Sequence, residues 1–188
     1  MNRPAADLQP ETDFRARFTT AEFLRMAEGG AFADMKVELV DGELERMTPP
    51  MSAHARRQME IAFALKRIFE NRPDIAVVAE IGIDLGGNTV RACDAAVATS
   101  WPEENRLLTP GELLLVVEIA ETTLARDLGP KRIDYARAGI PNYWVVDGER
   151  SVVHVYVDPI KGEYADVRTV RFGDPLAVPA TDEAIVID

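Results

Sequence analysis

The sequence contains a single cysteine, Cys93, and only two histidines among its 188 residues. One cysteine can form neither an intramolecular disulfide nor a cysteine cluster for zinc. Two histidines cannot supply a multi-histidine zinc site. Any metal ion held by this chain should therefore be bound by carboxylates, which favours magnesium or manganese.

Long apolar runs are also lacking. No stretch reaches the roughly 18 apolar residues of a transmembrane helix, so the sequence predicts no membrane span and no membrane partner. The opening segment, MNRPAADLQPETDF, is polar and has no apolar signal core. We therefore expect the protein to stay in the cytoplasm.

Positive charge is scarce. The chain has 21 Lys and Arg residues against 32 Asp and Glu residues, which gives a net charge of −11. Proteins that coat nucleic acid without specificity depend on neutralising its phosphates, so this balance argues against that class. A local basic patch remains compatible with the charge of the whole chain.

The rest of the composition is typical of a globular protein, with 47% hydrophobic and 28% charged residues. Residues 1–16 lack hydrophobic periodicity, and we expect a flexible N-terminus there. The length suits one domain over residues 17–188 with a substantial core. We find no internal repeat and no linker that would divide it.

Periodicity and turn residues predict a mixed order of helices and strands. A capping box of Thr19 and Glu22 starts a short helix over 19–30, and Asp41-Gly42 marks a hairpin. The further elements are a helix over 53–70, antiparallel strands over 75–85 and 89–98, a strand over 113–119, a helix over 130–138, and strands over 143–147 and 152–157. The unit over 113–147 can form a right-handed crossover between parallel strands. The predicted fold class is α/β, an α+β mixed sheet flanked by helices.

The helix over 53–70 has many apolar residues, and the sequence predicts a broad inward face for it. That face comprises Ala55, Met59, Ile61, Ala62, Phe63, Leu65, Ile68 and Phe69.

Two carboxylates interrupt strands that otherwise have the composition of a protein core. Glu118 lies in LLLVVEIA and Asp94 in TVRACDAAVA. An unpaired buried carboxylate costs several kcal/mol, and neighbouring carboxylates repel unless a cation or a proton joins them. Magnesium typically takes one or two carboxylates together with waters and phosphate oxygens. The pattern therefore predicts a shared metal site at Asp94 and Glu118.

Two further residues are candidates for this site. Lys131 opens the helix after the Glu118 strand, and its amine could reach back to stabilise charge or orient a water. Glu38, in KVELVDGEL, is a third strand carboxylate among apolar neighbours. A solvent-facing carboxylate and a solvated helix-start lysine are the alternatives. His54 reads as a surface or capping residue, with substrate contact as the alternative, and Tyr135 as a packing residue.

Four stretches resemble the Uma-type family of restriction endonuclease-like proteins, within the PD-(D/E)xK nuclease superfamily. They are VELVDGELERMTPPMSAHARR, TVRACDAAVA, LLLVVEIAETTLARDLGPKRIDYARAGIPNYWVVD and VHVYV, and the resemblance covers roughly residues 19–170. It implies a restriction endonuclease-like core. It also implies that Asp94 is the motif aspartate, Glu118 the motif acid and Glu38 the acidic residue of the N-terminal region.

The sequence departs from the family pattern at two positions. Ala120 stands where the motif lysine would be expected and where relatives commonly carry serine, and the resemblance implies that Lys131 has taken over the lysine's role. Cys93 replaces the usual proline before the aspartate.

The activity implied by the resemblance is metal-dependent hydrolysis of phosphodiester bonds, as in an endodeoxyribonuclease. Asp94, Glu118 and the carbonyl of Ile119 would hold Mg²⁺ or Mn²⁺. Nucleic acid, with DNA as the expected form, would be the substrate, and a homodimer is the oligomer that general frequencies favour. The candidates for phosphate contact are Arg56, Arg57, Arg126 and Arg132.

Two other functions stay open. A catalytically inactive member of the same fold would be a binding or assembly module, and the acidic charge and Ala120 favour it. It would bind no cation. A metal-free hydrolase with two carboxylates as acid and base would need an aromatic-lined cleft for a sugar, and an aromatic content of 7% gives this little support.

Overall fold

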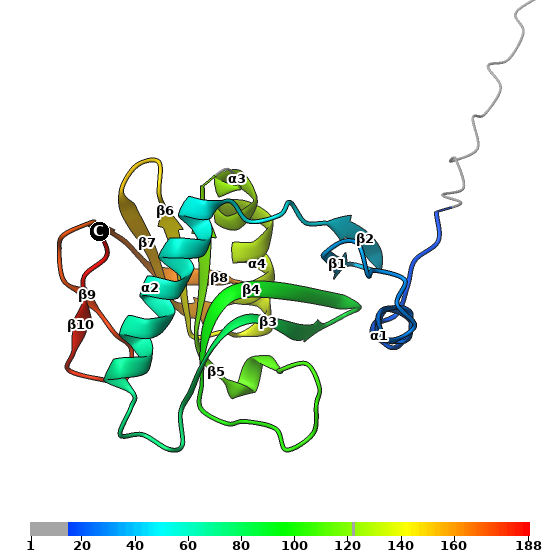
Figure 1. Ribbon diagram of the computed structural model, residues 1–188, viewed down its shortest axis with the longest axis horizontal. Coiled ribbons are helices and arrows are strands. Elements are labelled where there is room, and N and C mark those ends of the chain that lie inside the picture. Colours follow the sequence, from blue (N-terminus) through cyan, green and yellow to red (C-terminus); the bar gives the residue numbers. More distant parts are fainter. Residues whose placement is uncertain (1–14, 122) are drawn as a thin grey trace, which may run out of the picture.

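The computed structural model describes residues 15–121 and 123–188, so the expected flexible N-terminus over 1–16 lies outside the described residues except for 15 and 16. A large mixed sheet forms the centre of the protein, with α2 across one face and α4 on the other (Figure 1). This arrangement confirms the predicted fold class.

The helical elements are α1 (Thr20–Glu28), α2 (Ser52–Ile68), the 3₁₀ turn η1 (Pro110–Glu112), α3 (Leu124–Arg126), the π-helical turn η2 (Asp127–Lys131) and α4 (Arg132–Ala138). The strands are β1 (Val37–Val40), β2 (Glu43–Arg46), β3 (Ala76–Gly86), β4 (Thr89–Ala98), β5 (Leu113–Ala120), β6 (Asn142–Asp147), β7 (Val152–Ile160), β8 (Glu163–Arg171), β9 (Leu176–Ala177) and β10 (Ala184–Ile185).

The main sheet has the strand order β2-β1-β4-β5-β6-β7-β8, with β3 also paired to β4. Strands β5 and β6 are parallel, and the other pairs of this sheet are antiparallel. The chain between β5 and β6 contains α3, η2 and α4, as the expected crossover requires. The crossover places α4 against the face of β5 from which Glu118 projects.

Two hydrophobic clusters fill the space on the two faces of the sheet. On the α2 side, Ile61 and Leu65 are buried as predicted. Met59 and Phe63, however, are 69% and 63% exposed, and Ala55 is exposed as well, so the prediction that these three residues face inward is wrong. The helix packs a stripe of about one residue per turn against the sheet, and these side chains lie outside it.

The crossover helix begins earlier than the sequence suggested. Helical structure starts at Leu124, passes through η2 with Pro130 inside it, and continues as α4. Pro130 has no N–H for an α-helical ladder, which accounts for the wider turn beside it. Gly139 ends α4 in the left-handed region (φ 81°), as predicted for a glycine at this position.

The N-terminal elements follow their local signals. Thr19 caps α1 and forms the predicted capping box with Glu22. The β1–β2 hairpin turns at Asp41-Gly42, both with positive φ, as in a two-residue hairpin turn. None of the helices within 15–121 and 123–188 has the length and apolar content needed to cross a bilayer.

The carboxylate of Glu112 accepts several hydrogen bonds within the segment between β4 and β5. Glu112 accepts hydrogen bonds from the Arg106 guanidinium at 2.7 and 3.0 Å and from the Thr109 backbone N–H at 2.7 Å. These bonds, that of Arg106 first, lower the pKa of Glu112 from 4.5 to about 2. The carboxylate therefore contributes stability above pH 4.5 that is lost as the pH falls towards 2.

We expect Glu112→Gln to lower the free energy of unfolding by about 1–2 kcal/mol at neutral pH, less than the full shift because solvent screens the pair. The difference from the wild type should shrink as the pH falls from 4.5 towards 2. Urea unfolding across this range measures it, with Glu103→Gln in the same loop as control. A loss that does not depend on pH would contradict the assignment.

Candidate active site

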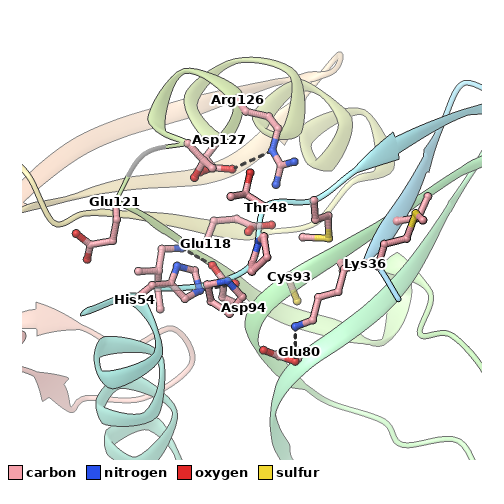
Figure 2. A pocket seen from close by; sticks show the side chains of 18 of the residues that line it. Lys36, Thr48, His54, Glu80, Cys93, Asp94, Glu118, Glu121, Arg126 and Asp127 are labelled. Atoms are coloured by element: carbon pink, nitrogen blue, oxygen red, sulfur yellow. Dashed lines mark hydrogen bonds and ion pairs between the residues drawn. The ribbon is translucent and has the colours of Figure 1, made fainter. Parts of the chain in front are cut away.

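Asp94 and Glu118 open into one pocket of about 360 Å³ (Figure 2). Its polar wall includes His54, Asp94, Glu118, Glu121, Arg126 and Asp127. Its apolar wall comes from α1 and from the segments before β1 and α2, and includes Phe23, Phe32, Met35, Met47, Pro49 and Met51. The pocket thus places two strand carboxylates opposite an apolar surface.

A break in the β3–β4 ladder accompanies the placement of Asp94. The register includes the residues on either side of Asp94 but not Asp94 itself, and the residue facing it, Glu80, has φ 53°. Oδ2 of Asp94 accepts a 2.6 Å hydrogen bond from the N–H of Ile119 on β5. Nε2 of His54 lies 3.1 Å from Oδ1, and Gln58 donates to the Asp94 carbonyl at 2.8 Å. Asp94 is therefore held by both β5 and α2.

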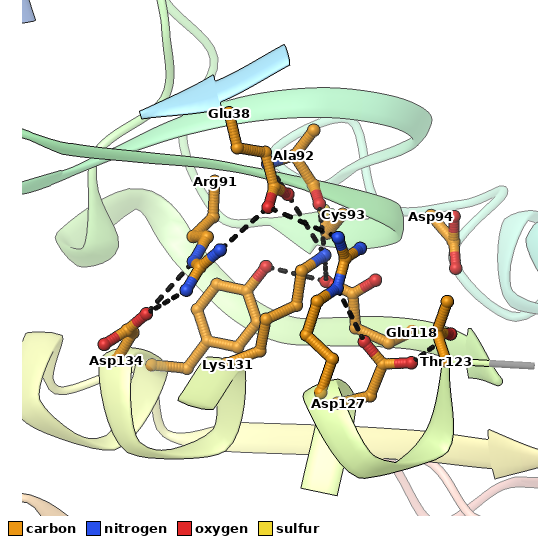
Figure 3. A network of polar contacts seen from close by, with 12 residues as sticks. Glu38, Arg91, Ala92, Cys93, Asp94, Glu118, Thr123, Asp127, Lys131 and Asp134 are labelled. Atoms are coloured by element: carbon orange, nitrogen blue, oxygen red, sulfur yellow. Dashed lines mark hydrogen bonds and ion pairs between the residues drawn. The ribbon is translucent and has the colours of Figure 1, made fainter. Parts of the chain in front are cut away.

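Helix α2 covers one face of β5, and the side chain of Glu118 projects from the other face. Its Oε1 accepts hydrogen bonds from Nζ of Lys131 at 2.8 Å and from the hydroxyl of Tyr135 at 2.7 Å. Figure 3 shows the carboxylate between Lys131 and Asp94. Burial raises the pKa of Glu118 to about 8, with Lys131 opposing this shift and Asp94 adding to it. Additional positive charge beside Glu118 would thus favour its ionised form.

Lys131 and Glu38 form the buried part of the same network. Lys131 is fully buried, donates to the Ala92 carbonyl at 2.9 Å and lies 3.2 Å from Oε1 of Glu38. Glu38 also accepts from the Ala92 N–H and from Arg91. Burial alone would raise the pKa of Glu38, but the charges of Lys131 and Arg91 hold it below its ordinary value.

Arg91 extends this network to the crossover helix. Its guanidinium is buried and contacts Glu45. It also donates to Glu38 and, at 2.7 and 3.0 Å, to Asp134 (Figure 3). A buried arginine with three carboxylate partners connects β1, β2, β4 and α4. Since Glu38 also contacts Lys131, this network holds Lys131 in place relative to these four elements.

The structure brings the four predicted catalytic residues together, but in two layers. Asp94 and Glu118 line the pocket, whereas Lys131 and Glu38 lie behind Glu118 and do not line it. Lys131 thus contacts Glu118 directly, and its ammonium is separated from the pocket by that carboxylate.

The predicted phosphate-binding arginines are dispersed. Arg126 lines the pocket. Arg57 is paired with Glu121, which also lines it. The other two lie outside the lining, Arg56 paired with Glu60 and Arg132 paired with Glu163.

His54 and Asp127 are pocket residues that sequence reasoning did not assign to the site. His54 contacts Asp94, and this hydrogen bond together with the Ile119 backbone raises the pKa of His54. Its position near a helix start was read as a capping or surface role, and only the long-range contact with Asp94 reveals the other role. Tyr135 lies one turn after Lys131 on the same helical face, and this spacing could have identified it.

Asp127, the first residue of η2 in the crossover segment, is buried. Its Oδ2 accepts a 2.6 Å hydrogen bond from the Thr123 hydroxyl. Within the part of the chain that the structure describes, its Oδ1 and the neighbouring Nε of Arg126, 3.9 Å away, have no hydrogen-bond partner. Burial raises the pKa of Asp127, while the charges of Lys131 and Arg126 and the hydrogen bond from Thr123 oppose this shift.

Asp94 and Glu118 could bind a cation whose remaining ligands are mostly water molecules. No group of three or more His, Cys, Asp or Glu side chains among residues 15–121 and 123–188 is arranged to hold a metal ion. Asp94 and Glu118 nevertheless face one pocket, and Mg²⁺ needs only one or two protein carboxylates.

The mixed sheet and the crossover helix, with paired strand carboxylates and a lysine, define a nuclease-type fold. The chain belongs to the Uma2 family, whose model, described as "Putative restriction endonuclease", matches residues 20–187. The resemblance seen in the sequence is thereby confirmed. Family and fold together indicate a restriction endonuclease-like nuclease, a class that generally uses divalent metals.

Among solved structures, the chain is similar to "a putative nuclease belonging to DUF820" from Anabaena variabilis ATCC 29413. The two share 18% sequence identity with a TM-score of 0.64, over 87% of this chain and 90% of the other. At this identity the likeness shows the fold alone. No curated protein matches the chain.

Proposed function

We propose that this protein is a metal-dependent endonuclease that hydrolyses phosphodiester bonds of DNA in the pocket beside Asp94 and Glu118. The observation that carries the proposal is the convergence of these carboxylates, from adjacent strands, on one pocket, with Lys131 bound to Glu118. Such a pair of oxygen ligands suits Mg²⁺ or Mn²⁺. The family and the fold agree with this chemistry.

Asp94, Glu118 and the carbonyl of Ile119 would hold the ion, which when bound would polarise the phosphate and lower the pKa of a water. The Ile119 N–H and His54 orient the Asp94 carboxylate from two sides. Lys131 and Tyr135 fix Oε1 of Glu118. These bonds hold the oxygen ligands in place before substrate binds, which reduces the reorganisation that the reaction requires.

Lys131 acts through Glu118 in this proposal. Its ammonium is buried behind that carboxylate and also contacts Glu38, so it does not reach the pocket to orient a water. Its charge instead opposes the effect of burial and favours the ionised form of Glu118. Lys131 is therefore a positioning residue.

The pocket favours a strand with an unpaired base as the substrate. Three of the four candidate arginines are paired with glutamates, and the net charge is −11, so few cations are free to follow a long duplex. The wall opposite the carboxylates carries Phe32, Met35 and Met47. An apolar and aromatic surface next to a reacting phosphate can stack an exposed base.

The test is cleavage of end-labelled oligonucleotides of one sequence as single strand, duplex and duplex with an unpaired flap, in Mg²⁺ or Mn²⁺. We expect cleavage of the single strand and the flap, little cleavage of the duplex, and none with a chelator present. Cleavage that persists in the chelator would contradict metal dependence, and preferred cleavage of the duplex would overturn the substrate assignment alone.

A catalytically inactive binding or assembly module is the second candidate. The observation in its favour is that His54 lies against Asp94 and Ile119, two of the three groups proposed to hold the ion. Absence of both cleavage and manganese binding would select this function.

A further inference from the structure

The strand β8 ends the main sheet and is covered by little else. Its one strand partner within the described residues is β7, so its other edge is unpaired there. Residues 165–169 are all exposed, and the side chain of Val167 is 56% accessible. Long exposed edge strands are templates for pairing with another strand, and proteins usually protect them. We therefore expect the open edge of β8, a strand of nine residues, to pair with another strand.

The sequence of β8, EYADVRTVR, is self-complementary about its centre. If two copies run antiparallel with Val167 opposite Val167, Asp166 of each faces Arg168 of the other. An acidic residue is thus placed opposite a basic one on each side of the central valines.

Neighbouring registers lack this property. Moving the centre by one residue places Asp166 opposite Asp166 or Arg168 opposite Arg168, and like charges directly opposite one another are destabilising. Asp166, Arg168 and Arg171 form no ion pair within the described part of the chain, so their charges are available to a partner. Charge therefore specifies a single antiparallel register.

The backbone of β8 is compatible with this register. The two-residue turn at Lys161-Gly162, with φ 54° and 82°, closes the hairpin between β7 and β8. The N–H of Phe172 donates to the carbonyl of Ser151, so in the regular part of the ladder, beyond the irregular position at Asp158, the backbone N–H and C=O groups of Asp166 and Arg168 point towards β7. Those of Val167 point outward, and Val167 of the two copies would form a hydrogen-bonded pair. Asp166 and Arg168 then fall in non-hydrogen-bonded pairs, where facing side chains lie closest.

We propose that β8 pairs with β8 of a second copy of this chain, antiparallel and centred on Val167, to form a homodimer with one continuous sheet. The two-fold axis repeats each ion pair, so two Asp166–Arg168 contacts flank the central valines. The proposal does not depend on nuclease activity.

Sedimentation equilibrium of the full chain over a range of concentrations tests it, with the wild type, Asp166→Arg, Arg168→Asp and the double variant. We expect a wild-type dimer and at least about tenfold weaker association for each single variant, because each places like charges opposite one another twice. The double variant exchanges the charges and should associate like the wild type. Asp182→Arg, an equal charge change in the exposed segment between β9 and β10, should leave association unchanged.

Circular dichroism of each variant shows whether it folds, and recovery in the double variant distinguishes pairing from misfolding. A monomeric wild type would overturn the proposal. So would folded single variants that associate like the wild type, or a double variant that remains monomeric.

Discussion

Asp94→Asn is expected to lower the rate of phosphodiester hydrolysis by about 10³-fold, since a catalytic metal contributes several kcal/mol and each 1.36 kcal/mol is tenfold. The substitution removes the charge of one proposed ligand. It keeps an oxygen that can still accept the hydrogen bond from the N–H of Ile119. The fold should therefore survive, and with it the stability of the strand pair β4–β5.

Two measurements test the Asp94→Asn variant, one of metal binding and one of cleavage. Calorimetric titration should show manganese binding by the wild type and none by Asp94→Asn, and single-turnover cleavage should show the loss of rate. Asp174→Asn, which changes an exposed aspartate in the same way, should resemble the wild type in both. Wild-type cleavage by Asp94→Asn would remove Asp94 from the mechanism. Manganese binding by Asp94→Asn as tight as that of the wild type would instead assign the ion to other groups.

Lys131→Met is expected to lower the free energy of unfolding by about 3–5 kcal/mol, the loss typical of removing one partner from a buried ion pair. Methionine can fill the space of the lysine stem. It leaves Glu38 and Glu118 buried without the cation that lies 3.2 and 2.8 Å from them. The penalty is thus the loss of this ion pair at two buried carboxyl groups, of which Glu38 keeps Arg91 as a partner, rather than a loss of packing.

Urea unfolding measures this loss, with Lys66→Met on the exposed side of α2 as the control, for which a change within about 0.5 kcal/mol is expected. Adding Glu118→Gln to Lys131→Met should recover part of the stability, because glutamine does not have to be protonated in the folded state, as Glu118 with its pKa raised to about 8 does. If Lys131→Met unfolds like the control, the buried network does not hold the site together. Additive losses in the double variant would show that the two residues are not coupled.

Much of the fold could be predicted because its signals are local. The Thr19 capping box, the Asp41-Gly42 hairpin and the glycine that ends α4 each depend on a few adjacent residues. The crossover between β5 and β6 follows from two apolar strands separated by a helix. The width of the buried face of α2 could not be predicted, since it depends on how closely the sheet approaches, and Met59 and Phe63 remain exposed.

For the site, the sequence by itself determined which groups are chemically out of place: Asp94 and Glu118 in core strands, and Lys131 in the crossover that follows. A carboxylate among apolar residues needs a partner wherever the fold places it, so the signal does not require a structure. The tertiary structure alone decided that Lys131 lies behind Glu118, that His54 contacts Asp94, and that most of the arginines are paired. Those contacts join residues far apart in the chain, and their geometry depends on the packing of whole helices and strands, which no local pattern records.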